Sequence, residues 1–232
     1  MKRTFILGDT HGRFKEFFEL VERHSLKDFN LIHVGDIGVG FECHKEEWLK
    51  GINKRFNEKE INFYGIRGNH DDPAYFDGSV KLSNLSLLPD KSILELNGEN
   101  YLMYGGGISI DRFWRTKNET FWENEGSSDF DESEITKFKK IDYVISHNCP
   151  RSAFPLPREG NKLFLMDYSP KDLNLVKDVS ADLNKLDKLE SCLIKNFEVK
   201  KWFYGHYHVY SKKEIGKIKY QCLNVSELVL NE

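Results

Sequence analysis

The sequence predicts an α/β protein, a sandwich of mixed sheets with helices on the outside. Short apolar, β-branched runs alternate with amphipathic segments from Thr4 to Ile66, an order typical of parallel strands joined by crossover helices. A hairpin pattern follows in the middle of the chain, around the turn-forming pair Asn97-Gly98. Further apolar runs near the C-terminus are of strand length. Together these observations predict one layered domain over residues 1–232.

Five elements are expected in the first part of the chain. Strands are predicted at Thr4–Leu7, Leu31–Val34 and Ile61–Ile66, where apolar residues are continuous. Helices are predicted at 14–21 and 48–56, where apolar residues recur every three or four positions. The three strands are therefore expected to be parallel neighbours.

The second part of the chain adds a hairpin, two strands, a helix and a closing hairpin. The predicted ranges are Ser92–Leu96 with Tyr101–Tyr104, Ile141–Ile145, Leu183–Ile194, Val199–Tyr204 and 213–225. Four of the six prolines fall between Pro150 and Pro170, which indicates a surface loop. A loop and helix insertion is therefore expected at about 150–198.

Composition excludes several classes of protein. With 39% hydrophobic and 31% charged residues in 232, the chain is neither disordered nor fibrous. No apolar run is long enough to cross a membrane, and a net charge of −3 gives no strong nucleic-acid signature. The four cysteines form no paired motif, which favours reduced thiols and a cytoplasmic protein.

Potential metal ligands follow almost every predicted strand. The carboxyl ends of strands in open α/β folds converge on one crevice, so ligands far apart in sequence can meet there. The residues in these positions are Asp9 and His11, Asp36, Asn69 and His70, His147, and His206 and His208. The pattern as a whole predicts a metal site.

The ligand types indicate which ions would bind. Carboxylate, imidazole and carboxamide groups suit divalent Mn, Fe, Co, Ni or Zn, and no thiolate occupies these positions. Asp9 and His11 would lie on the same side of an extended segment and hold one ion. The carboxylate of Asp36 is the natural candidate to bridge two ions. Two ions roughly 3.5–4 Å apart would hold a phosphate and a bridging hydroxide together.

The ordered motifs resemble those of the calcineurin-like metallophosphoesterases, in particular small bacterial and phage members. The matching segments are Gly8-Asp9-Thr10-His11-Gly12, Gly35-Asp36, Gly68-Asn69-His70-Asp71, Ser146-His147 and Gly205-His206-Tyr207-His208. The resemblance implies a four-layer αββα sandwich of two mixed sheets flanked by helices, with a dinuclear metal centre.

The resemblance also assigns roles by position. It implies that Asp9, His11, Asp36 and His208 hold the first metal, and that Asp36, Asn69, His147 and His206 hold the second. It places His70 beside the phosphate, where it would stabilise the transition state or protonate the leaving oxygen. The unperturbed pKa of histidine, about 6.5, allows that donation near neutral pH.

One departure from the protein Ser/Thr phosphatase branch concerns the groups around His70. In that branch an Asp and an Arg follow the Gly-Asp motif, whereas here Asp36 is followed by Ile37-Gly38-Val39-Gly40. We expect Asp71 or Asp72 to orient His70 instead. Replacement phosphate ligands would be arginines, because the guanidinium matches phosphate oxygens. The candidates are Arg13, Arg112 and Arg115.

The expected function is metal-dependent hydrolysis of phosphate monoesters by a metal-bridging hydroxide. Two divalent ions per chain are expected, with Mn favoured. The partner would be a phosphorylated small molecule, nucleotide or phosphoprotein, and the enzyme a protein Ser/Thr-type or broad-specificity phosphatase, monomeric or a small homo-oligomer. One alternative is a phosphodiesterase or nuclease acting on cyclic nucleotides or nucleic acid. Another is a non-catalytic, metal-dependent scaffold that binds a protein.

Overall fold

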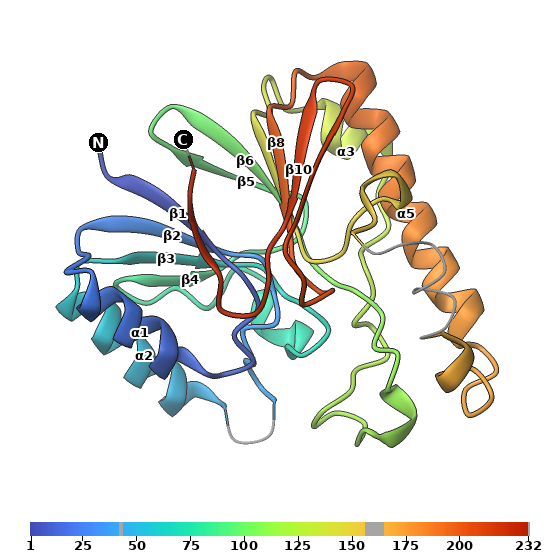
Figure 1. The fold of residues 1–232 in the computed structure, drawn as a ribbon, viewed down its shortest axis with the longest axis horizontal. Helices are drawn as coiled ribbons and strands as arrows, with labels where there is room; N and C mark the ends of the chain where they lie inside the picture. Colours follow the sequence, from blue (N-terminus) through green and yellow to red (C-terminus); the bar gives the residue numbers. More distant parts are fainter. Residues whose placement is uncertain (42–43, 156–164, 232) are drawn as a thin grey trace.

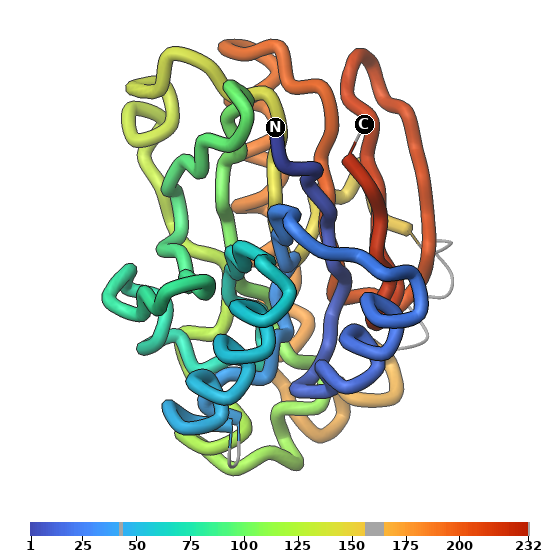
Figure 2. The backbone as a smooth tube through the Cα atoms, turned by 90° about the vertical axis from the view of Figure 1, so that its left-hand side faces the viewer, coloured from blue at the N-terminus to red at the C-terminus, as the bar shows by residue number. Residues whose placement is uncertain are grey.

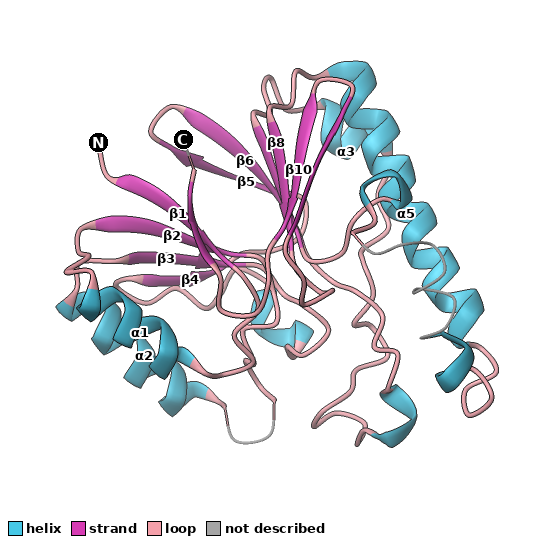
Figure 3. Ribbon diagram, in the orientation of Figure 1, coloured by secondary structure: helices cyan, strands magenta, loops and turns pink. Residues whose placement is uncertain are grey.

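Two β-sheets pack face to face, with helices on the outer face of each (Figures 1 and 3). The structure, a computed structural model, describes residues 1–41, 44–155 and 165–231. Helices α1 (Phe14–Arg23) and α2 (Glu46–Glu58) cover one sheet, and α3 (Glu132–Thr136) and α5 (Leu175–Asn196) cover the other. The predicted αββα sandwich of two mixed sheets is confirmed.

The first sheet contains the three strands predicted at the start of the chain. Its order is β11-β1-β2-β3-β4, in which β1 to β4 are parallel and β11 is antiparallel to β1. The bounds are β1 Arg3–Leu7, β2 Phe29–His33, β3 Asn62–Gly65, β4 Leu85–Leu87 and β11 Leu228–Leu230.

The second sheet has the order β5-β6-β7-β8-β10-β9. Its central strands β6, β7, β8 and β10 are parallel, and each edge is closed by an antiparallel hairpin strand. The bounds are β5 Ser92–Leu96, β6 Glu99–Tyr104, β7 Tyr143–Ser146, β8 Lys201–Tyr204, β9 Ser211–Ile215 and β10 Ile218–Cys222.

Alternation along the strands divides the interior into three apolar layers. In β1, Phe5 and Leu7 face α1 and α2, whereas Ile6 packs between the sheets. In β8, Phe203 packs between the sheets, whereas Trp202 belongs to the layer under α5. Successive side chains of a strand point to opposite faces, so a strand buried on both faces reads as the continuous apolar run seen in the sequence.

The chain ends differ from the sequence prediction. The closing hairpin spans β9 and β10 rather than 213–225, and the chain then crosses to the first sheet as β11. The pairing of β11 with β1 brings the two termini side by side (Figure 2). Strands β4 and β11 are three residues each, too short for a periodic pattern to reveal.

The expected insertion at 150–198 contains helix α5, which packs its apolar face on the second sheet. Residues 156–164 of that insertion lie outside the described residues, as does Cys43. The other cysteines, Cys149, Cys192 and Cys222, are buried free thiols. Among the described helices, none is both long and apolar enough to cross a membrane.

Candidate metal centre

The predicted ligands lie at the carboxyl ends of five strands and share an unusual backbone geometry. Four of them adopt the left-handed region, with φ of 47° at His11, 57° at Asp36, 69° at His206 and 53° at His208. Non-glycine residues seldom adopt positive φ, and such residues concentrate at functional sites. The chain therefore enters a turn at His11 and is not the extended segment expected between Asp9 and His11.

Two glycines in the motifs make room for the buried carboxylates. A Cβ atom at Gly205 would lie 2.0 Å from Oδ1 of Asp9, and one at Gly68 would lie 2.1 Å from Oδ1 of Asp36. No side chain can replace either glycine without displacing an acid of the site. The glycines of the motifs are thus required by close approach as well as by turns.

Asp9, His11, Asp36 and His208 form the first group of converging ligands. One potential ligand atom from each lies within 4.8 Å of all the others. The Nε2 atoms of His11 and His208 are 3.0 Å apart, and Nε2 of His208 is 3.3 Å from Oδ2 of Asp9. These four residues are those that the resemblance assigns to the first metal.

Asn69, His147 and His206 form a second group, which adjoins Asp36. Oδ1 of Asn69 lies 2.9 Å from both Nε2 of His147 and Nδ1 of His206. Nε2 of His147 is in turn 3.2 Å from Oδ1 of Asp36. The structure therefore places Asp36 between the two groups, with its other oxygen, Oδ2, 3.8 Å from Nδ1 of His11.

The donor atoms of both groups fit divalent cations. Nδ1 of His147 lies 3.0 Å from the carbonyl oxygen of Val34; donation to that carbonyl leaves Nε2 with a lone pair facing the carboxamide oxygen of Asn69. Oδ1 of Asp9 is buried without a hydrogen-bond partner among the described residues. Nε2 of His147 and Oδ1 of Asn69 are acceptors that face each other, and Oδ1 of Asp9 is an acceptor without a donor; both arrangements suit a bound cation. The ligand types favour Mn, Fe, Co, Ni or Zn.

The two buried carboxylates of the site, Asp9 and Asp36, have pKa values shifted in opposite directions. Burial and the nearby carboxylate of Asp9 raise the pKa of Asp36 to about 6. Burial also acts to raise the pKa of Asp9, but the hydrogen bond with His208 and the neighbouring imidazoles lower it to about 2. Positive charge between them would favour the ionised form of both acids.

His70 faces the ligand groups from the turn after β3, next to Arg115. Nη2 of Arg115 lies 2.6 Å from Nε2 of His70, and the ring of Phe41 stacks on the imidazole. Burial and the Arg115 guanidinium lower the pKa of His70 to about 2. The pKa of His70 thus lies well below the unperturbed 6.5, which favours a neutral imidazole whose Nε2 accepts a hydrogen bond from Arg115.

The three candidate arginines occupy different positions. Arg115 lines a cavity of about 390 Å³ together with residues of both ligand groups. Arg112 instead forms ion pairs with Asp172 and with Asp178 of α5, which corrects the prediction that it binds phosphate. Arg13 is exposed just before α1.

Asp71 supports the backbone around the site and does not orient His70. Its buried carboxylate accepts hydrogen bonds from four backbone N–H groups, those of Ile37, Gly38, Val39 and Gly68, at 2.7–3.1 Å. Asp72 accepts from the N–H of Ala74 and caps a short 3₁₀ helix, η1 (Pro73–Phe76). The prediction that either acid orients His70 is corrected. Asp71 instead ties the loop after Asp36 to the turn that carries Asn69.

We expect Asp71→Asn to lower the free energy of unfolding by about 2–4 kcal/mol, because an amide nitrogen would face backbone donors that have no other partner. Urea unfolding measures this change. The neighbouring substitution Asp72→Asn is the matched control, since asparagine also caps helices, and should change stability by less than about 0.5 kcal/mol. Equal unfolding midpoints for the two variants would contradict this role of Asp71.

Two buried residues that the sequence did not single out as site residues lie behind Asn69. The hydroxyl of Ser109 is 2.9 Å from Nδ2 of Asn69 and 2.7 Å from the carboxylate of Glu125. Both lie in the chain after the Gly105-Gly106-Gly107 run. Neither lies in the motifs that carry the predicted metal ligands, so those motifs do not identify them.

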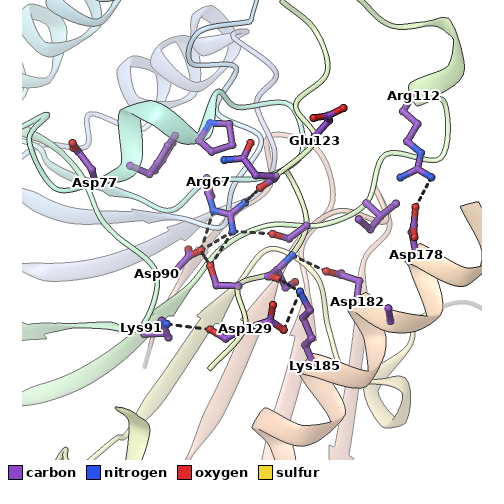
Figure 4. Close-up of a pocket in the computed structure, with 18 residues that line it drawn as sticks. Arg67, Asp77, Asp90, Lys91, Arg112, Glu123, Asp129, Asp178, Asp182 and Lys185 are labelled. Atoms are coloured by element: carbon purple, nitrogen blue, oxygen red, sulfur yellow. Dashed lines mark hydrogen bonds and ion pairs between the residues drawn. The ribbon is translucent and has the colours of Figure 1, made fainter. Parts of the chain in front are cut away.

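Arg67 anchors the same segment to the turn after β3. Its guanidinium pairs with Asp90 at 2.7 Å and donates to the carbonyls of Glu125 and Gly126, each at 2.8 Å. Figure 4 shows the pairing of Arg67 with Asp90 on the wall of a second cavity, of about 790 Å³. The cationic side chains that line this cavity are Arg67, Lys91, Arg112 and Lys185, and each has an acidic partner.

Comparisons with known proteins give one match to a family and several to solved structures. The family model described as calcineurin-like phosphoesterase matches residues 2–210. No curated protein sequence matches the chain. Similar structures include a conserved uncharacterized protein from Streptococcus pneumoniae TIGR4, described as a predicted phosphoesterase, with 14% identity and a TM-score of 0.36. That match covers 97% of this chain and 74% of the other.

Two further structures match over nearly the whole chain. Phosphopantetheinyl hydrolase from Mycobacterium tuberculosis has 12% identity and a TM-score of 0.44, over 97% of this chain and 90% of the other. GAP50, titled the anchor in the inner membrane complex of Plasmodium, has 13% identity and a TM-score of 0.42, over 96% of this chain and 71% of the other.

Proposed function

Because this chain belongs to the calcineurin-like phosphoesterase family, a family of metal-dependent phosphoesterases, we propose that it hydrolyses phosphate monoesters at a dinuclear centre. The observation that carries the proposal is the position of Asp36 between two groups of ligands, with His70 and Arg115 beside them. Asp9, His11, Asp36 and His208 would hold one cation, and Asp36, Asn69, His147 and His206 the other.

When bound, two divalent cations would lower the pKa of water toward about 7 and offset the charge of the phosphate. The protein's own groups would do the rest. Arg115, half of a short ion pair with Asp111 at 2.6 Å, would offer its guanidinium to the phosphate oxygens. Its fork geometry binds two of them at once.

His70 would act as a neutral hydrogen-bond donor. An imidazole with a lowered pKa carries one N–H and one lone pair, and in the free protein the lone pair on Nε2 is taken by Arg115. The remaining N–H stabilises charge that develops on the phosphate or the leaving oxygen. Of the two roles implied for His70, this supports transition-state stabilisation over delivery of a full proton.

A monoester is supported by Arg115, the one arginine among the described residues that line the cavity of about 390 Å³. A guanidinium beside two cations favours a terminal phosphate with two negative charges over a diester with one. We propose Mn²⁺ as the resident ion, because the oxygen and imidazole donor set suits it.

The first test is removal of the metal. Chelator-treated protein should lose hydrolysis of p-nitrophenyl phosphate by about a hundredfold or more and regain it with Mn²⁺, since such ions contribute several kcal/mol to catalysis. Calorimetric titration of the stripped protein should find two Mn²⁺ sites. Activity that survives complete removal of metal, or a single site, would contradict the dinuclear proposal.

The second test compares substrates side by side. Wild-type protein loaded with Mn²⁺ should hydrolyse p-nitrophenyl phosphate or a phosphopeptide faster than bis-p-nitrophenyl phosphate or 2′,3′-cyclic AMP. The reverse order would identify a phosphodiesterase. Two bound ions with no hydrolysis of any of the four compounds would favour the scaffold alternative.

A further inference from the structure

The hydroxyl of Ser109 makes three hydrogen bonds in the interior of the protein. It lies 2.9 Å from Nδ2 of Asn69, 2.9 Å from Nη1 of Arg115 and 2.7 Å from Oε2 of Glu125. Ser109 and Glu125 are each 1% exposed, so water does not compete for these contacts. A metal ligand and the phosphate-facing arginine therefore share one buried hydroxyl.

The chemistry of the partners fixes the direction of every bond. A hydroxyl has one proton to donate and two lone pairs to accept. The carboxylate of Glu125 accepts only, and its other oxygen, Oε1, is already bonded to the backbone N–H of Ser109 at 2.7 Å. The hydroxyl proton must therefore point to Glu125, and the two lone pairs face the amide of Asn69 and the guanidinium of Arg115.

This direction decides which end of the Asn69 side chain faces the metal site. With Nδ2 donating to Ser109, Oδ1 points toward His147 and His206. If the hydroxyl donated to Asn69 instead, the amide would turn and present N–H groups, which cannot bind a cation. The direction of the Ser109 O–H thus decides whether Asn69 presents its carboxamide oxygen, which can bind a cation, or its NH₂ group, which cannot.

We propose that Glu125 and Ser109 form a positioning pair that holds Asn69 in its metal-binding orientation and Arg115 toward the phosphate. The inference rests on the dinuclear centre proposed above. Neither residue touches the substrate or a metal; both act through Asn69 and Arg115. Burial raises the pKa of Glu125 to about 7, although the hydrogen bonds from Ser109 and the charges of Arg115 and Arg112 act to lower it. The tests are therefore done at pH 8, where the carboxylate is ionised.

The experiment measures Mn²⁺ affinity of stripped protein by calorimetry, for wild type, Ser109→Ala, Glu125→Gln and the double variant. Each single substitution should weaken one of the two Mn²⁺ sites about ten- to a hundredfold, the usual effect of a lost partner of a ligand, and leave the other nearly unchanged. Glutamine at 125 can satisfy the backbone N–H of Ser109 only by turning its amide NH₂ to the hydroxyl, which reverses the chain of bonds.

The double variant separates positioning from general loss of structure. If both residues act through one chain of bonds, Ser109→Ala/Glu125→Gln weakens the site no more than Ser109→Ala alone, whereas independent effects would multiply. Ser127→Ala is the matched control, because Ser127 is likewise buried, at 2% exposed, but among the described residues its hydroxyl contacts only the carbonyl of Gly106, at 3.3 Å. It should bind both ions as wild type does.

Two outcomes would overturn the pair: equal Mn²⁺ affinities for Ser109→Ala and Ser127→Ala, or weakening of both sites to the same degree in every variant. These outcomes differ from failure of the proposed function, which wild-type protein alone reveals if it does not bind two ions.

Discussion

Asp36→Asn should remove both cations together and lower the rate of phosphate-ester hydrolysis by about a thousandfold, which is about 4 kcal/mol of transition-state stabilisation. Asp36 is expected to show this largest effect because its carboxylate adjoins both ligand groups, with Oδ1 3.2 Å from Nε2 of His147 and Oδ2 3.8 Å from Nδ1 of His11. The amide of asparagine keeps the shape but supplies one oxygen and no charge.

Metal content after dialysis against Mn²⁺, measured by mass spectrometry, tests this expectation. Wild type should hold two ions per chain and Asp36→Asn fewer than one. Asp77→Asn is a matched control, because Asp77 is exposed and its carboxylate contacts the backbone N–H of Ser79, away from the ligands. If Asp36→Asn loses one ion and keeps the other, the proposal that Asp36 contributes to both cation sites is refuted.

The sequence was sufficient to predict the sandwich and the set of converging residues because both follow from backbone order. Parallel strands joined by helices place their carboxyl ends on one edge of each sheet. The packing of the two sheets face to face then brings together residues as distant as Asp9, after β1, and His208, after β8. Strand β11 was missed for the opposite reason: three residues carry no periodicity, and only pairing with β1 defines them.

Side-chain partners and burial were beyond the sequence. Arg112 and Arg115 lie on the same short segment, yet Arg112 turns to Asp178 on α5, 66 positions away, while Arg115 turns to His70. The pKa of His70 could not be predicted from the sequence either, because it depends on burial and on an arginine that is distant in sequence. The Ser109 hydroxyl is likewise defined only by three partners that the fold brings together.

His70→Ala should lower kcat by about a hundredfold or more while both cations stay bound, the usual scale for loss of a group that assists proton transfer or charge development. The metal centre should persist because His70 contacts it through the main chain: its backbone N–H donates to Oδ1 of Asp36 at 2.8 Å, and alanine keeps that bond. Single-turnover hydrolysis of p-nitrophenyl phosphate and metal content, measured on the same samples, test both parts.

Arg115→Gln provides the contrast that separates the two side chains. Loss of the guanidinium should raise KM for a monoester by about tenfold, because a charge-assisted hydrogen bond contributes about 1.5–3 kcal/mol. It should leave an N–H donor at His70.

The effect of His70→Ala should not depend on pH. Because the lowered pKa makes His70 neutral throughout the range from pH 6 to 9, removal of the His70 side chain should lower kcat by the same factor across that range. A ratio of wild-type to His70→Ala rates that falls tenfold per unit as pH rises above 6.5 would instead show that the protonated imidazole is the active form.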